Sequence, residues 1–149
     1  MNPHNTLEKM RTMRLRTMAE LYQQSLNGTL YKDLSLDQVM ANLVDAEWEE
    51  RQQRKIARLI KQAGFRQQAS PTDINYEPGR GLDKTMIERL LSLAFVKNAE
   101  NLIITGSTGT GKSWLGQAIG RQACLMLRKT RYFVTSRFFE AAKLAKLDG

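Results

Sequence analysis

The stretch Gly106-Ser107-Thr108-Gly109-Thr110-Gly111-Lys112-Ser113 decides how this chain is interpreted. It matches the pattern G-x-x-x-x-G-K-[ST], the phosphate-binding loop (Walker A motif) of nucleoside triphosphatases. Glycines in such a loop let backbone N–H groups close around an anion without a Cβ in the way. A helix that starts at the loop adds unpaired N–H donors and the positive end of its dipole. The motif therefore predicts a site for the phosphates of a nucleotide.

The residues of this loop are expected to play different parts. Lys112 would reach the β- and γ-phosphates, and the Ser113 hydroxyl would hold Mg²⁺. The predicted nucleotide-binding residues are Gly106, Ser107, Thr108, Gly109, Thr110, Gly111, Lys112 and Ser113. The alternative is a chance glycine turn between a strand and a helix. The motif by itself says neither which nucleotide binds nor what its energy drives.

The sequence on both sides of the loop predicts an α/β fold. Residues 101–105 are short, apolar and β-branched, as in a buried strand, and residues 131–135 repeat this pattern. Between them, residues 114–127 carry apolar side chains at helical spacing. A strand–helix–strand order implies a parallel pair with a right-handed crossover. Ser136 is expected to cap a final helix that runs to Leu147.

Two long helices are predicted before the loop. The first covers residues 5–27, and the second runs from about residue 36 to residue 63. Ser35 and Gln38 form a capping-box pair at the start of the second helix, and Gly64 is placed to end it. Trp48 is expected to be a packing anchor on this helix.

Prolines and glycines between residues 66 and 81 predict a linker. The expected domains are an N-terminal helical domain at 1–65, the linker at 66–81 and a partial P-loop domain at 82–149. Asp83 is expected to cap a helix at the start of that last domain.

Positive charge is concentrated in the second half of the chain. The formal net charge is +8; residues 1–80 hold 12 Lys/Arg against 10 Asp/Glu, and residues 81–149 hold 11 against 5. Such an excess favours polyanions such as nucleic acid, but solvated helix faces would explain it equally well. The main contributors are Arg121, Arg128, Lys129, Arg131, Arg137, Lys143 and Lys146.

The remaining composition suggests a cytoplasmic protein. Cys124 is the single cysteine, so no internal disulfide can form, and its apolar neighbours indicate a buried small hydrophobe. With one histidine, His4, besides it, a protein-only zinc site is not expected. No apolar stretch approaches the length of a membrane span, and no secretory signal is visible.

A complete phosphoryl-transfer site needs more than the loop. A second acidic motif, at the end of an apolar strand, usually helps to hold Mg²⁺. No such strand follows Ser113: Glu140 lies inside a helical pattern, and Asp148 follows Lys146-Leu147. No catalytic residue is therefore identified, and hydrolysis by this chain alone stays open. Two parallel strands are rarely stable by themselves. The chain is thus expected to be the N-terminal piece of a longer ATPase, or to obtain its missing strands from a partner.

Several segments together resemble one protein family. They are Met1-Asn2-Pro3-His4, Met13-Arg14-Leu15, Arg80-Gly81-Leu82-Asp83, residues 101–106 leading into the loop, Arg131-Tyr132-Phe133, Ser136-Arg137 and Asp148-Gly149. With the loop, they make the chain similar to the IstB-like transposition helper ATPases of insertion sequences. These proteins are related to the DnaC-type helicase loaders within the AAA+ class. The resemblance extends over essentially the whole chain.

The resemblance implies an N-terminal helical domain followed by an AAA+ domain. It implies that residues 106–113 bind ATP with Mg²⁺, that the protein assembles on DNA as a homo-oligomer, and that it assists a partner transposase. The second acidic motif, the sensor residue and the trans-acting arginine of the family have no counterpart here. Two alternatives stay open: a DnaC-like helicase loader, and a non-enzymatic remnant that keeps only interaction or DNA-binding surfaces.

Overall fold

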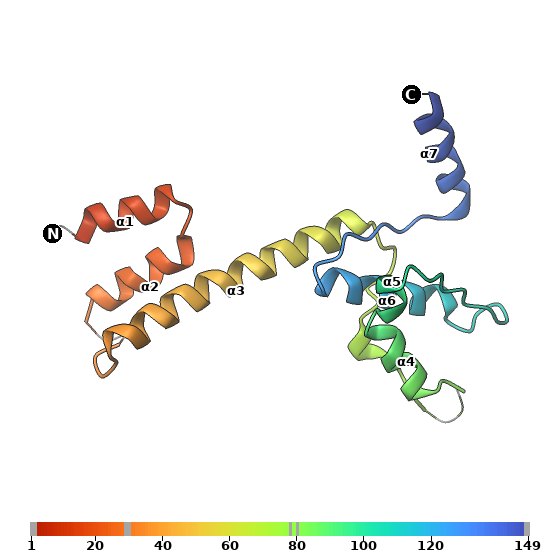
Figure 1. Cartoon of the computed structure of the whole chain (residues 1–149), viewed down its shortest axis with the longest axis horizontal. Helices are drawn as coiled ribbons and strands as arrows, with labels where there is room; N and C mark the ends of the chain where they lie inside the picture. Colours follow the sequence, from red (N-terminus) through yellow and green to blue (C-terminus); the bar gives the residue numbers. More distant parts are fainter. Residues whose placement is uncertain (1–2, 29–30, 78, 80, 148–149) are drawn as a thin grey trace. The chain divides into compact units, whose positions relative to one another are not determined.

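The fold comes from a computed structural model, which describes residues 3–28, 31–77, 79 and 81–147. Helices provide the regular structure of this part of the chain (Figure 1). They are α1 (Pro3–Thr12), α2 (Arg16–Leu26), α3 (Leu36–Ala63), the 3₁₀ turn η1 (Pro71–Asp73), α4 (Lys84–Leu91), α5 (Ala94–Lys97), α6 (Lys112–Leu125) and α7 (Thr135–Leu147). Parts of the resemblance rest on Met1, Asn2, Arg80, Asp148 and Gly149, which lie outside the described residues.

The predicted α/β fold class, with a parallel-sheet P-loop domain, is wrong for the described residues, which contain helices and no strand. Segments 101–105 and 131–134, expected as a parallel pair, are connections without regular structure on either side of α6. A strand forms only where backbone groups pair with a neighbouring strand in a ladder. Here the Tyr132 N–H donates instead to the Ala63 carbonyl, at 2.8 Å, where α3 ends. The predicted right-handed crossover is therefore absent from the described structure.

The single helix predicted over residues 5–27 is two helices, α1 and α2. The chain turns at Arg14, whose φ of 60° is left-handed. The Arg14 N–H donates to the Arg11 carbonyl at 2.9 Å, and the Leu15 N–H donates to the Met10 carbonyl at 2.8 Å. This pair of bonds is the Schellman pattern, which normally uses a glycine. An arginine takes that position here, so no glycine marks the break in the sequence. The apolar periodicity also continues through it.

The prediction of α3 is confirmed, together with its local signals. The Ser35 N–H donates to Gln38 Oε1 at 2.9 Å, and the Gln38 N–H donates to Ser35 Oγ at 3.3 Å. Gly64, with a φ of 70°, follows the last helical residue. The Asp83 side chain likewise caps α4, because it accepts from the Thr85 and Met86 N–H groups. α7 begins at Thr135, one residue before the predicted cap.

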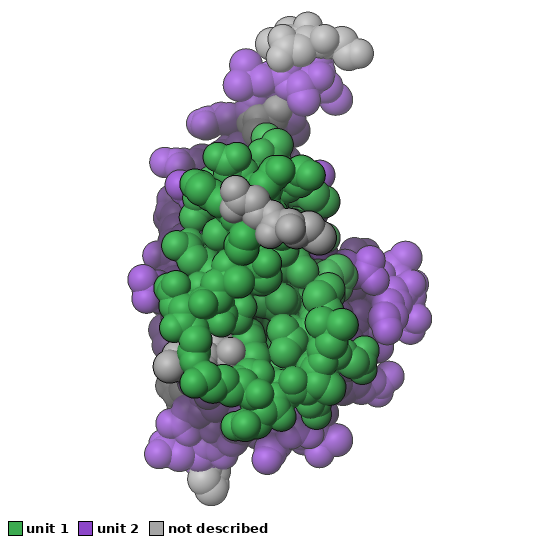
Figure 2. All heavy atoms as spheres, turned by 90° about the vertical axis from the view of Figure 1, so that its left-hand side faces the viewer, with its two compact units in different colours: residues 1–55 green, residues 56–149 purple. Residues whose placement is uncertain are grey.

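Backbone contacts divide the chain into two compact units, residues 1–55 and residues 56–149, which Figure 2 shows in different colours. The division falls within α3, so this helix contributes residues to both units. We describe each unit by itself. The predicted domain limits, with a linker at 66–81, stay a prediction.

Unit 1, residues 1–55, is organised around a buried carboxylate. Glu47 is 4% exposed and accepts hydrogen bonds from the Thr17 N–H at 2.9 Å and the Met18 N–H at 3.3 Å. It therefore caps the first turn of α2 from a neighbouring helix, which satisfies N–H groups that have no partner within α2. Arg51 also reaches Glu47, with Nε 2.8 Å from Oε1. A polar cluster thus holds α2 on α3.

The contacts of Glu47 set the pKa of its carboxyl group. Burial alone raises the pKa of the Glu47 carboxyl, but hydrogen bonds from Arg51, Met18 and Thr17 outweigh it and lower the pKa below its ordinary value. A carboxyl whose pKa is lower in the folded state stabilises that state above its unfolded pKa, and this contribution disappears as pH falls through the folded pKa.

We therefore expect the free energy of unfolding of unit 1 to decrease in acid, below the ordinary glutamate pKa of about 4.3. Urea denaturation between about pH 6 and about pH 3 measures this decrease in the free energy of unfolding, with hydrogen exchange of the unit 1 amides as the readout. In Glu47→Gln the pH dependence should be flatter. Equal slopes for the two proteins would contradict the prediction.

Unit 2, residues 56–149, has an apolar centre where the end of α3 meets α6. Leu59, Ala63 and Cys124 are buried there, and Ile60 and Phe65 pack against them. The prediction that Cys124 is a buried small hydrophobe is confirmed, since its exposure is 0%. η1 and α4 also lie against α6, which makes α6 the central helix of this unit. Within the described residues, no helix combines the length and the apolar character needed to cross a membrane.

Candidate nucleotide-binding site

The structure places all eight residues of the predicted loop together, at the start of α6. Gly106 to Gly111 form an exposed turn, and α6 begins at Lys112. Gly109 and Gly111 have φ values of 83° and 85°, which residues with a Cβ rarely adopt. The glycines of the motif therefore make the tight entry into the helix possible. In Figure 1 this turn projects from the body of unit 2.

Two side chains of the loop converge on the Ser107 carbonyl. Thr110 Oγ1 donates to it at 2.9 Å, and the Lys112 ammonium donates to it as well. The Lys112 side chain therefore lies back over the loop backbone and is only half-exposed. An ammonium group in this position can exchange one carbonyl oxygen for the oxygens of a phosphate without leaving the loop.

The N-terminal end of α6 is open to a ligand. Gly111 stands at the N-cap position, and no side chain caps the helix there. The N–H groups of the first turn and the helix dipole therefore favour an anion at this end. Ser113 lies exposed in the same turn, next to Lys112. The donor set thus combines the backbone of a glycine loop, an ammonium group, the N–H groups of an uncapped helix end and a hydroxyl.

These residues fit a magnesium-bound polyphosphate. Mg²⁺ commonly takes one or two protein oxygens and obtains its other ligands from phosphate and water. The Ser113 hydroxyl is the one protein ligand that the sequence predicts. In the part of the chain that the structure describes, no three His, Cys, Asp or Glu side chains gather to hold a metal. Phosphate oxygens would therefore have to supply much of the coordination of any ion here.

One polar residue of this site was not predicted from the sequence. Gln117 lies one turn after Ser113 on α6 and is 2% exposed. Its Oε1 accepts from the backbone N–H groups of Arg66, at 2.8 Å, and Gln67, at 3.0 Å. Its Nε2 donates to the Ser113 carbonyl at 3.1 Å. Nothing local distinguishes this glutamine from one on a solvated face, because its partners are about 50 positions away.

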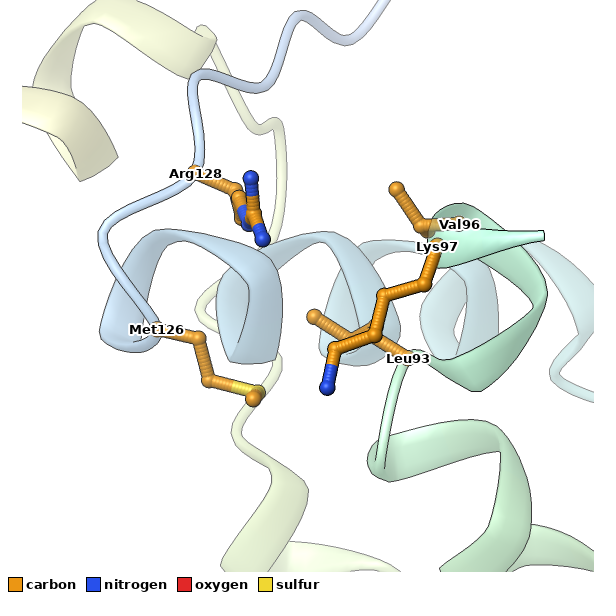
Figure 3. A pocket seen from close by; sticks show the side chains of 5 residues that line it. All are labelled: Leu93, Val96, Lys97, Met126 and Arg128. Atoms are coloured by element: carbon orange, nitrogen blue, oxygen red, sulfur yellow. The ribbon is translucent and has the colours of Figure 1, made fainter. Parts of the chain in front are cut away.

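A separate hollow of about 330 Å³ lies where α5 and the end of α6 meet (Figure 3). Its apolar wall is formed by Leu93, Val96 and Met126. Lys97 and Arg128 bring two positive charges to the same hollow. Arg128 belongs to the basic set that the sequence singled out, whereas Lys97 does not.

Comparison with known proteins assigns the chain to a family. The family model of the IstB-like ATP binding proteins matches residues 8–149. The insertion sequence ATP-binding protein y4pL of Sinorhizobium fredii is 36% identical over 98% of this chain and 60% of its own length. The ATP-binding protein named for insertion sequence IS1162 of Pseudomonas fluorescens is 33% identical over 100% of this chain and 65% of its own length. The chain thus spans a little under two thirds of these relatives.

Proposed function

Because the chain belongs to the family of IstB-like ATP-binding proteins, we propose that residues 106–113 bind Mg-ATP and that the protein is a helper in DNA transposition. The observation that supports this most is the geometry of the loop. Its glycines lead into an uncapped helix, and the Lys112 ammonium lies over its backbone. ATP, rather than another triphosphate, follows from the family and from the names of the relatives.

The partners belong to the same proposal. The relatives are proteins of insertion sequences, which favours a transposase as the partner over a replicative helicase. We propose that a homo-oligomer of such chains assembles on DNA, in the cytoplasm. The remnant reading, in which only interaction surfaces persist, predicts no response to ATP.

Thermal melting of the full chain with Mg-ATP tests the proposal directly. A ligand that binds only the folded state adds RT ln(1 + [L]/Kd), about 2.7 kcal/mol at a hundredfold excess over Kd. For a unit of the size of unit 2, which carries the loop, we expect the melting temperature to rise by roughly 10 °C. MgCl₂ alone is the control for the metal. A cooperative melt that ATP does not move would overturn the proposal.

For the DNA part of the proposal, Lys97 and Arg128 are the strongest candidates. Both line one hollow, and neither forms an ion pair with a described residue. Cations that neutralise phosphates give a binding constant that falls with salt, with a slope of about −0.9 per phosphate.

We expect the double variant Lys97→Glu/Arg128→Glu to bind duplex DNA more weakly. Its salt slope should be smaller by about two, because two phosphate contacts are lost. Fluorescence anisotropy across a salt series measures both quantities. Lys32→Glu, an exposed lysine of unit 1, serves as the single-charge control. An unchanged slope in the double variant would exclude these residues as phosphate contacts.

A further inference from the structure

Gln117 joins two parts of unit 2 that the sequence keeps far apart. Its side-chain oxygen uses both lone pairs, on the N–H groups of Arg66 and Gln67. Its amide nitrogen uses both hydrogens, on the Ser113 carbonyl at 3.1 Å and on Gln67 Oε1 at 3.5 Å. A buried amide with every position satisfied is held in one orientation. Gln117 is therefore a fixed bridge between the first turn of α6 and the segment that follows α3.

The segment after α3 is held on α6 by apolar contacts as well. The Phe65 ring lies over Gly120, so closely that a Cβ at residue 120 would be 2.9 Å from Phe65 Cε1. Ala63 packs with Cys124 in the centre of the unit. These contacts lie further along α6, whereas the Gln117 bridge reaches back to Ser113. Gln117 is thus the contact that links residues 66 and 67 to the turn carrying Lys112 and Ser113.

We propose that Gln117 is a positioning residue that transmits occupancy of the phosphate loop to residues 66 and 67, in the segment that follows α3, an inference that rests on the proposed ATP binding. A bound nucleotide would hold the first turn of α6 through Lys112 and Ser113. Gln117 donates to the carbonyl of that same Ser113. Fixing this carbonyl fixes the amide that accepts from residues 66 and 67, so their local opening requires more free energy.

Residue-resolved hydrogen exchange of the full chain, with and without Mg-ATP, tests this proposal. We expect the amides of Arg66 and Gln67 to exchange at least about fivefold more slowly with ATP, the lower end of common coupling strengths. The midpoint of this change should coincide with that of ATP binding. In Gln117→Met the two N–H groups lose their acceptor, so they should exchange faster and lose the response to ATP.

A matched substitution separates the bridge from general effects on α6. Gln122 lies on the same helix, and its side chain makes no hydrogen bond with a described residue. Gln122→Met should keep the ATP response at residues 66 and 67. Because coupling is reciprocal, Gln117→Met should also bind ATP about fivefold more weakly, whereas Gln122→Met should not.

The possible results distinguish the two proposals. If ATP raises the melting temperature but leaves exchange at residues 66 and 67 unchanged, the bridge is not a transmitter and ATP binding stands. A Gln117→Met protein that keeps the full ATP response would overturn the bridge in the same way. If ATP does not bind the unmodified chain, both proposals are overturned. Should Gln117→Met fail to fold, the exchange titration of the unmodified chain decides.

Discussion

Lys112→Ala is expected to remove nearly all of the stabilisation by Mg-ATP. The Lys112 ammonium already lies over the loop, where it donates to the Ser107 carbonyl, so it needs little rearrangement to meet a phosphate. A hydrogen bond to a charged group contributes up to about 3 kcal/mol, or roughly a hundredfold in Kd. At an ATP concentration that stabilises the wild type by about 2.7 kcal/mol, the variant should gain only about 0.4 kcal/mol. Melting curves with and without ATP measure this difference.

A second lysine controls for the loss of charge. Lys143 is exposed on α7, away from the loop in sequence, and Lys143→Ala removes the same charge. We expect its ATP-dependent shift to equal that of the wild type. The Lys112→Ala protein should also melt normally without ligand, because Lys112 is only half-buried. An unchanged ATP affinity in Lys112→Ala would refute the assignment of the loop.

Features set by neighbouring residues could be predicted from the sequence. The capping pair Ser35–Gln38, the cap at Asp83 and the end of α3 at Gly64 all involve residues within three positions of each other. The entry into α6 at the glycine loop is of the same kind. These signals do not depend on the rest of the fold, which is why they are reliable.

Helix ends without glycine could not be predicted. Arg14 follows the end of α1, Ala99 follows α5, and Leu127 follows α6; all three residues have left-handed φ values of 55° to 60°. In each case the next N–H donates five residues back, as in a Schellman motif. The hydrogen bonds of this motif satisfy carbonyls at each helix end, which offsets part of the local cost of about 1–2 kcal/mol for such a conformation. No residue type near these positions predicts that the helix ends there.

The two predicted strands show the limit of a β pattern. Leu102 and Ile104 are half-buried while Ile103 is 82% exposed, which is the alternation of an extended segment with one covered face. Phe133 alternates with its neighbours in the same way. The pattern therefore describes which side chains turn inward, but pairing depends on a neighbouring strand, which the described residues do not provide.

Apolar periodicity also overestimated burial on α3. Leu43 is 2% exposed, but Trp48, predicted to be a packing anchor, is 63% exposed. The buried face of α3 instead includes the charged Glu47. A helical pattern treats each apolar residue as inward and each charged residue as outward. Glu47 and Gln117 are buried because distant backbone N–H groups need acceptors, and that need is invisible in a local pattern.

Glu47→Ala is expected to destabilise unit 1 by about 2–4 kcal/mol. The substitution leaves the Thr17 and Met18 N–H groups without their acceptor at the start of α2. It also removes the carboxylate that pairs with Arg51, whose Nε lies 2.8 Å from Oε1, and with Arg54, one of whose terminal nitrogens lies 3.8 Å from Oε1. A buried donor left unsatisfied costs about 1–3 kcal/mol, and the lost ion pair adds less than this because the Arg51 side chain is 48% exposed. A unit of this size has little stability to spare, so its unfolding should become measurable in mild urea.

Glu50→Ala on the same helix provides the comparison. Glu50 pairs with Arg54 at 3.3 Å, but both side chains are about half-exposed, at 49% and 48%. Exposed pairs of this kind contribute about 0.3–0.5 kcal/mol, so this variant should unfold almost like the wild type. Amide exchange at Thr17 and Met18 gives a local readout: it should accelerate in Glu47→Ala and not in Glu50→Ala. Equal destabilisation by the two variants would mean that the helix charge matters and the buried cap does not. A larger effect of Glu47→Ala, together with faster exchange at the start of α2, would establish that a carboxylate on α3 holds α2 in place.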